Sequence, residues 1–239
     1  MRYSGLFFSL LIMIFFTGCN NAQKIIQKEY KYEKTALGNH LFIFDIHLEN
    51  IGNSGKIYNL VNKLIYDNRN FDEYAEYRER NFIGDSGDAG YPSGTEYDYQ
   101  SGLTEKYSIV FNSGTHIIFQ YNSYVYTSVA AHGNSFVKYF IIDLNEQRIL
   151  EIADLIYPIP DDLLKTIIES SYNDIHYLRE NIWPPDTINF SNGNIELMWN
   201  TYTITPYAVG TILIEIQDKT IEQYLTEKGK MLSKITALK

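Results

Sequence analysis

Histidine and carboxylate side chains are the groups in this 239-residue sequence that could carry out acid–base chemistry. Of the five histidines, His132 lies in a stretch of small residues, and Asp143 and Asp154 follow it along the chain. A histidine and a carboxylate that meet in one cleft can take up and release protons near neutral pH. One hypothesis is therefore an enzyme in which His132 works with these two carboxylates.

Other catalytic and metal-binding patterns are absent from the sequence. The histidine spacings match no zinc-protease or deaminase motif, and neither a serine nucleophile elbow nor a phosphate-binding glycine loop occurs. The acidic stretch 85–90 lacks the alternating oxygen ligands and the terminal glutamate of an EF-hand calcium loop. We therefore expect no metal and no cofactor.

Cys19 is the single cysteine, which excludes an intramolecular disulfide and any multi-cysteine metal site. Arg2 and the apolar run 6–16 precede it, with Thr17 and Gly18 between the run and the cysteine. The run is shorter than the roughly 20 residues of a membrane span and is typical of a secretion signal. Residues 16–19, Phe-Thr-Gly-Cys, resemble the lipobox of bacterial lipoproteins. The alternatives are an ordinary signal peptide and an uncleaved anchor.

The lipobox resemblance implies cleavage before Cys19, a diacylglycerol on its sulfur and a further acyl chain, such as palmitate, on its amino group. Two or three acyl chains, at about 0.8 kcal/mol per buried methylene, form a durable anchor. We therefore expect a lipoprotein in the cell envelope, with the folded part outside the cytoplasm. The chain has 20 basic and 29 acidic side chains, a formal charge of −9, which argues against a nucleic-acid partner.

Hydrophobic periodicity predicts an α+β fold, an antiparallel sheet with two or three helices packed on it. Residues 83–103, rich in glycine, aspartate and tyrosine, are predicted to form a long loop or an irregular hairpin. Alternation of apolar and polar residues predicts strands at 25–34, 40–51, 107–112, 115–127, 136–144, 187–190, 195–199 and 211–216. Spacings of three and four predict helices that begin near residues 54, 161 and 219.

Two stretches together resemble a known family. In residues 126–134 a Tyr-Thr strand end leads to an Ala-His-Gly turn, and residues 202–210 read Tyr-Thr-Ile-Thr-Pro-Tyr-Ala-Val-Gly. This order resembles the extracytoplasmic domain of the RsiV-like family, a domain of unknown function also attached to peptidoglycan deacetylases of the PdaC type. After the predicted signal peptide at 1–18 and a short tether at 19–27, the resemblance implies a smaller strand–helix lobe at 28–103 and an RsiV-like domain at 104–239.

The resemblance implies a binding module, because the family includes a sensor that binds lysozyme. The segments that carry other known activities of the family, a sigma-factor-binding segment and a deacetylase domain, have no counterpart in this sequence. The leading hypothesis is a non-catalytic lipoprotein that binds a lysozyme-like protein or a cell-wall glycan. The alternatives are a polysaccharide-modifying enzyme and a purely structural lipoprotein. The candidate binding residues are Tyr126, His132, Tyr202 and Tyr207.

Overall fold

The structure is a computed structural model that describes residues 26–37, 40–50, 55–69, 73–74, 76–78, 80–81, 99–127, 132–172, 178 and 182–238. The predicted signal peptide, Cys19 and residues 83–98 of the glycine-rich stretch 83–103 lie outside the described residues. No helix in these ranges combines the length and the apolar character needed to cross a membrane.

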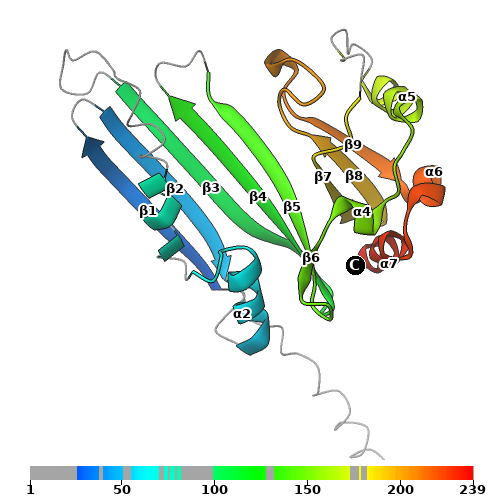
Figure 1. The fold of residues 1–239 in the computed structure, drawn as a ribbon, viewed down its shortest axis with the longest axis horizontal. Coiled ribbons are helices and arrows are strands. Elements are labelled where there is room, and N and C mark those ends of the chain that lie inside the picture. Colours follow the sequence, from blue (N-terminus) through cyan, green and yellow to red (C-terminus); the bar gives the residue numbers. More distant parts are fainter. Residues whose placement is uncertain are drawn as a thin grey trace, which may run out of the picture.

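The larger sheet has six strands that follow one another in chain order (Figure 1). Neighbouring strands are antiparallel, except that the second and third run parallel. Alternating apolar and polar residues form such long strands because successive side chains point to opposite faces of a sheet. The strands are β1 (Ile26–Leu37), β2 (His40–Asn50), β3 (Tyr99–Asn112), β4 (His116–Thr127), β5 (Asn134–Asp143) and β6 (Arg148–Leu150).

The smaller sheet is antiparallel and lies beside β5 (Figure 1). It consists of β7 (Thr187–Ser191), β8 (Asn194–Trp199) and β9 (Ile212–Gln217). The backbone N–H of Tyr139 on β5 donates to Thr187 Oγ1 on β7, at 2.8 Å, so the two sheets are joined at this edge. The helices are α2 (Gly55–Leu64), α4 (Ile152–Leu155), α5 (Asp161–Ser171), α6 (Asp218–Ile221) and α7 (Glu227–Thr236), with 3-10 turns η1 (Tyr207–Val209) and η2 (Glu222–Tyr224).

The α+β class predicted from the sequence is confirmed, and α2, α5 and α7 begin close to the predicted helix starts. One expectation was wrong, because residues 99–103 belong to β3 rather than to a loop. Their pairing with β2 and β4 overrides the weak strand propensity of a segment that contains Ser101 and Gly102. The expected lobe boundary at 103–104 falls inside this strand.

The centre of the larger sheet is covered on both faces. Ile118 and Ile141 face the main core, where they join apolar residues of the smaller sheet and of α5. Ile117 and Phe119 point to the opposite face, towards Val61 of α2. This two-sided burial explains the uninterrupted apolar run 117–119 of β4, because a strand covered on one face would alternate instead.

Helix α7 lies close against α4, which closes one end of the main core. A Cβ atom at position 229 would collide with the backbone carbonyl oxygen of Leu155, so only glycine allows this approach. The helix begins at Thr226, whose side chain accepts from the Gly229 N–H at 3.1 Å and donates to the Asp154 carbonyl at 2.6 Å. This N-cap fixes both the first residue of α7 and the position of α7 against α4.

A buried ion pair lies on the face of the larger sheet covered by α2. Glu105 on β3 has a fully buried side chain, and Arg78 donates to both of its carboxylate oxygens at 2.7–3.1 Å. Tyr121 donates to the same carboxylate at 2.5 Å. Beside it the hydroxyls of Tyr74 and Tyr107 are 3.0 Å apart, and burial raises the pKa of Tyr74 to about 12. These contacts attach residues 73–81 to the sheet.

Candidate functional site

Exposed tyrosines gather where β4 ends and β5 begins. Tyr124 and Tyr126 are both exposed and are two residues apart on β4, so they share one face of the sheet. Gly133 lies just before β5, and a Cβ atom there would collide with the Tyr124 hydroxyl. Glycine at this position therefore lets the Tyr124 ring lie against the backbone of the turn that carries His132.

The loop after β8 brings Tyr202 to the same end of the molecule (Figure 1). The Tyr202 hydroxyl lies 3.4 Å from His132 Nε2, and 46% of the residue is exposed. We call Tyr124, Tyr126, His132 and Tyr202 the tyrosine surface. It presents flat aromatic rings with polar edges, a combination that stacks on sugars and packs against protein partners.

Tyr202 has an unusual backbone conformation. Its φ angle is +72°, in the left-handed region that glycine adopts readily and a bulky side chain does not. A residue held there costs the fold about 1–3 kcal/mol and persists only where its surroundings impose it. Such positions are concentrated at active and ligand-binding sites.

Asn200 and Asp186 impose this conformation from two sides. The Asn200 side chain accepts from the Val137 N–H on β5 at 2.7 Å and donates to the Val137 carbonyl at 3.0 Å. The Asp186 carboxylate accepts from the Asn200 N–H at 2.6 Å and from the Thr203 hydroxyl at 2.7 Å. Asn200, two residues before Tyr202, is thus anchored to β5, and Thr203, directly after it, is anchored to Asp186 beside the start of β7.

The structure brings three of the four predicted binding residues to this one end. Tyr126, His132 and Tyr202 belong to the tyrosine surface, while Tyr207 begins η1 and its side chain is not among those described. Sequence reasoning did not select Tyr124, and it gave no role to Asp186 or Asn200. The signal available in the sequence was the spacing of Tyr124 and Tyr126, because residues two apart on a predicted strand share one face.

His132 does not meet the carboxylates of the enzyme hypothesis. Strand β5 runs from Asn134 to Asp143, a length of about 30 Å at 3.3 Å per residue. Asp143 and Asp154 therefore lie towards the opposite end of the sheet, where both are engaged in ion pairs. No group of three or more metal-ligating side chains converges in the described ranges. A cavity of about 560 Å³ between α2 and the turns at Gly114 and Leu144 also lies at that opposite end.

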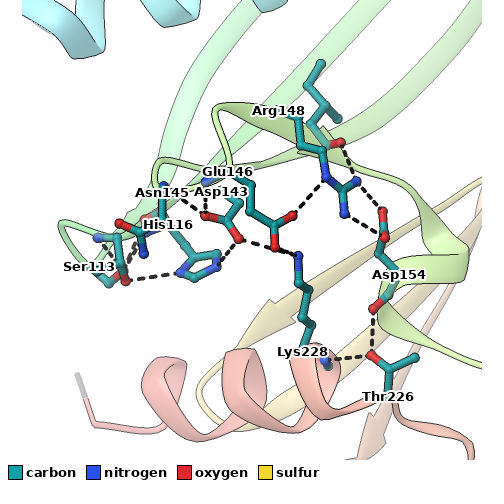
Figure 2. A network of polar contacts seen from close by, with 12 residues as sticks. Ser113, His116, Asp143, Asn145, Glu146, Arg148, Asp154, Thr226 and Lys228 are labelled. Carbon is teal, nitrogen blue, oxygen red and sulfur yellow. Dashed lines mark hydrogen bonds and ion pairs between the residues drawn. The ribbon is translucent and has the colours of Figure 1, made fainter.

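Asp143 and Asp154 belong to a polar network that ties α7 to the ends of β4, β5 and β6 (Figure 2). Lys228 of α7 lies 3.6 Å from Asp143 and 2.5 Å from Glu146. Arg148 forms two hydrogen bonds to Asp154, at 2.7 and 2.8 Å, which hold the pKa of that carboxyl at about 2. Every charge here has an opposite partner, so we assign the network to stability.

His116 is the buried member of this network. Burial lowers the pKa of its imidazole, assisted by the Lys228 ammonium and opposed by the Asp143 carboxylate 3.6 Å away. For Asp143, burial would raise the pKa, but hydrogen bonds from the Glu146 and Asn145 N–H groups and the charges of His116 and Lys228 lower it. The folded protein therefore favours a neutral His116 beside an ionised Asp143.

Replacing His116 with glutamine is expected to flatten the pH dependence of stability below neutrality. The unfolded chain takes up a proton at His116 near pH 6.5, whereas the folded chain resists it, so stability falls as the pH drops below about 6.5. The slope in this window is at most about 1.4 kcal/mol per pH unit for one group. Urea unfolding of both proteins at pH 5 to 7.5 measures it, and equal slopes would contradict this role of His116.

Comparison with solved structures identifies the architecture. The chain superposes on a DUF3298 family member from Bacteroides fragilis with a TM-score of 0.65 and 17% identity, covering 91% of this chain and 100% of the other. A DUF3298 family protein from Pseudomonas aeruginosa gives a TM-score of 0.58 and 15% identity over 88% and 97% of the two chains. This chain has the DUF3298 fold. No family model matches the sequence, and no curated protein matches it significantly.

At these identities the likeness establishes the shared fold alone. The DUF3298 fold of this chain is consistent with its sequence resemblance to the RsiV-like family. The chemistry of the site rests on the residues of this chain, because a fold does not determine a function.

Proposed function

We propose that this chain is a lipoprotein, anchored through Cys19 outside the cytoplasm of a bacterium, that binds an envelope ligand through the tyrosine surface. The observation that carries the proposal is the held, strained Tyr202 beside His132. A protein that required only a stable fold would gain from glycine at this position, since glycine adopts the conformation without strain. The tyrosine at this position is explained if its exposed ring contacts the ligand.

A binding role fits the tyrosine surface better than catalysis does. It combines exposed aromatic rings with a histidine, whereas the carboxylates considered for acid–base work lie elsewhere, Asp143 at the far end of β5 and Asp154 in α4. The ring of tyrosine gives a large contact area and loses little conformational entropy on binding. The resemblance to the RsiV-like family favours a lysozyme-like protein or a cell-wall glycan as the ligand. The formal charge of −9 also favours a basic protein, by steering and complementarity.

Titration of the full chain with hen lysozyme and, separately, with soluble peptidoglycan fragments tests this function. If the ligand is a basic protein, we expect saturable lysozyme binding at 25 mM salt that weakens at 300 mM, because surface charge attraction is screened. If the ligand is a glycan, the fragments bind instead and salt has little effect. Binding of neither at low ionic strength would overturn the proposal.

A further inference from the structure

A second surface, formed by other residues than the tyrosine surface, has the features of a ligand groove. A cavity of about 370 Å³ lies between α4, the start of α5 and residues 184–185. Its buried residues are apolar: Ile156, Ile159, Leu164 and Pro185. A volume of this size with an apolar floor and a few polar groups at its edge is typical of a binding site.

Two aromatic side chains stand exposed beside this groove. Tyr157 lines it and is 56% exposed, and Trp183, which directly precedes the lining residue Pro184, is 61% exposed. Their backbones are fixed, since the Tyr157 N–H donates to the Tyr224 carbonyl at 2.7 Å and the Trp183 carbonyl accepts from the Trp199 indole at 2.8 Å. The exposure is therefore a property of a rigid part of the fold.

The charge of the groove selects among ligands. Among the described lining residues Asp161 is the one that carries a charge, Asp162 follows it, and neither forms an ion pair with another described residue. None of the described residues that line the groove is a lysine or arginine. Anionic ligands are repelled by this arrangement, and a ligand that carries a positive charge next to an apolar segment gains from both parts of the groove.

We propose that this groove binds an extended peptide segment in which proline or aliphatic residues stand beside a lysine or arginine. Grooves walled by aromatic and proline side chains bind extended, proline-containing peptides, whose pre-formed conformation loses little entropy on binding. The apolar residues of the peptide enter the floor at Ile156 and Ile159, and its basic residue reaches Asp161. A saccharide fits this floor poorly, because among the described lining residues only Tyr157 and Asp161 offer polar side-chain partners for its buried hydroxyls.

Selection from a displayed library of random 12-residue peptides tests this proposal on the full chain in detergent, with counter-selection on the Tyr157→Ala variant. Enriched peptides should carry lysine or arginine next to proline, leucine or isoleucine. Binding of the synthetic peptides can be followed by fluorescence, because Trp183 is exposed whereas Trp199, the other tryptophan, is buried. We expect Tyr157→Ala to weaken binding more than about fivefold.

Asp161→Asn should weaken binding about two- to fivefold, as an exposed charge pair would. Glu169→Gln is the matched control, because Glu169 is an exposed carboxylate further along the same helix and should leave the affinity unchanged. The proposal is overturned if no peptide is enriched, if the enriched peptides lack basic residues, or if Asp161→Asn and Glu169→Gln behave alike. Preferential binding of the neutral glycan chitotetraose over every selected peptide would also overturn it.

Discussion

Replacing Arg78 with methionine is expected to lower the free energy of unfolding by about 3–5 kcal/mol, since removing one partner of a buried ion pair leaves the other charge uncompensated. Glu105 is 0% exposed at the centre of β3, and the Arg78 guanidinium supplies three of the contacts to its carboxylate. Without Arg78, the Tyr121 hydroxyl is the remaining donor among the described contacts. One neutral hydrogen bond does not offset the burial of a carboxylate.

A matched control separates this effect from the loss of any surface arginine. Arg80 pairs with Glu76 at 3.0 Å in the same segment, but both side chains are more than half exposed. Arg80→Met should therefore change the stability by less than about 0.5 kcal/mol. The double variant Arg78→Met/Glu105→Met removes the buried carboxylate together with its partly exposed partner and should recover most of the loss. Urea unfolding measures all three, and equal losses in Arg78→Met and Arg80→Met would contradict the role of the buried pair.

This ion pair also shows where sequence reasoning ends. Arg78 and Glu105 are 27 residues apart, and nothing in either local sequence indicates that they meet. The strands around them were predictable because alternation is a local property, as in β9, where buried and exposed residues alternate throughout. Pairing partners are not local, so neither the parallel contact of β2 with β3 nor the extension of β3 back to Tyr99 could be predicted.

The candidate site was predictable in part for the same reason. His132 and Tyr202 were selected from their motifs, and the structure places their side chains 3.4 Å apart although they are 70 residues apart in sequence. The positive φ angle of Tyr202 was not predictable, because it arises from the contacts of Asp186 and Asn200 with distant residues. Asp143 and Asp154 looked equally suitable for chemistry, and only the length of β5 separates them from His132.

Tyr202→Gly is expected to weaken ligand binding at least about 30-fold while preserving or improving the stability of the fold. A central aromatic contact contributes about 2 kcal/mol or more to affinity, which corresponds to this factor. Tyr202→Ala should lose the same affinity, but it keeps a Cβ atom at φ +72°. The glycine variant should therefore be about 1 kcal/mol more stable than the alanine variant, since glycine is not strained in the left-handed region.

Tyr157→Ala is the control for this comparison. Tyr157 is another exposed tyrosine, but it lies at the groove beside α4 rather than on the tyrosine surface, so its loss should not affect this ligand. If Tyr202 were held in its conformation for stability alone, the glycine variant would be less stable than the wild type and would bind normally.

The most direct measurement is a calorimetric titration of three proteins, the wild type, Tyr202→Gly and Tyr157→Ala. The titrant is whichever ligand the wild type binds, lysozyme or the peptidoglycan fragment. Urea unfolding of the same samples measures their stability. If the tyrosine surface binds the ligand, Tyr157→Ala should have the wild-type affinity. Tyr202→Gly should bind the ligand at least about 30-fold more weakly without losing stability. Unchanged affinity in a folded Tyr202→Gly protein would contradict a binding role for this surface.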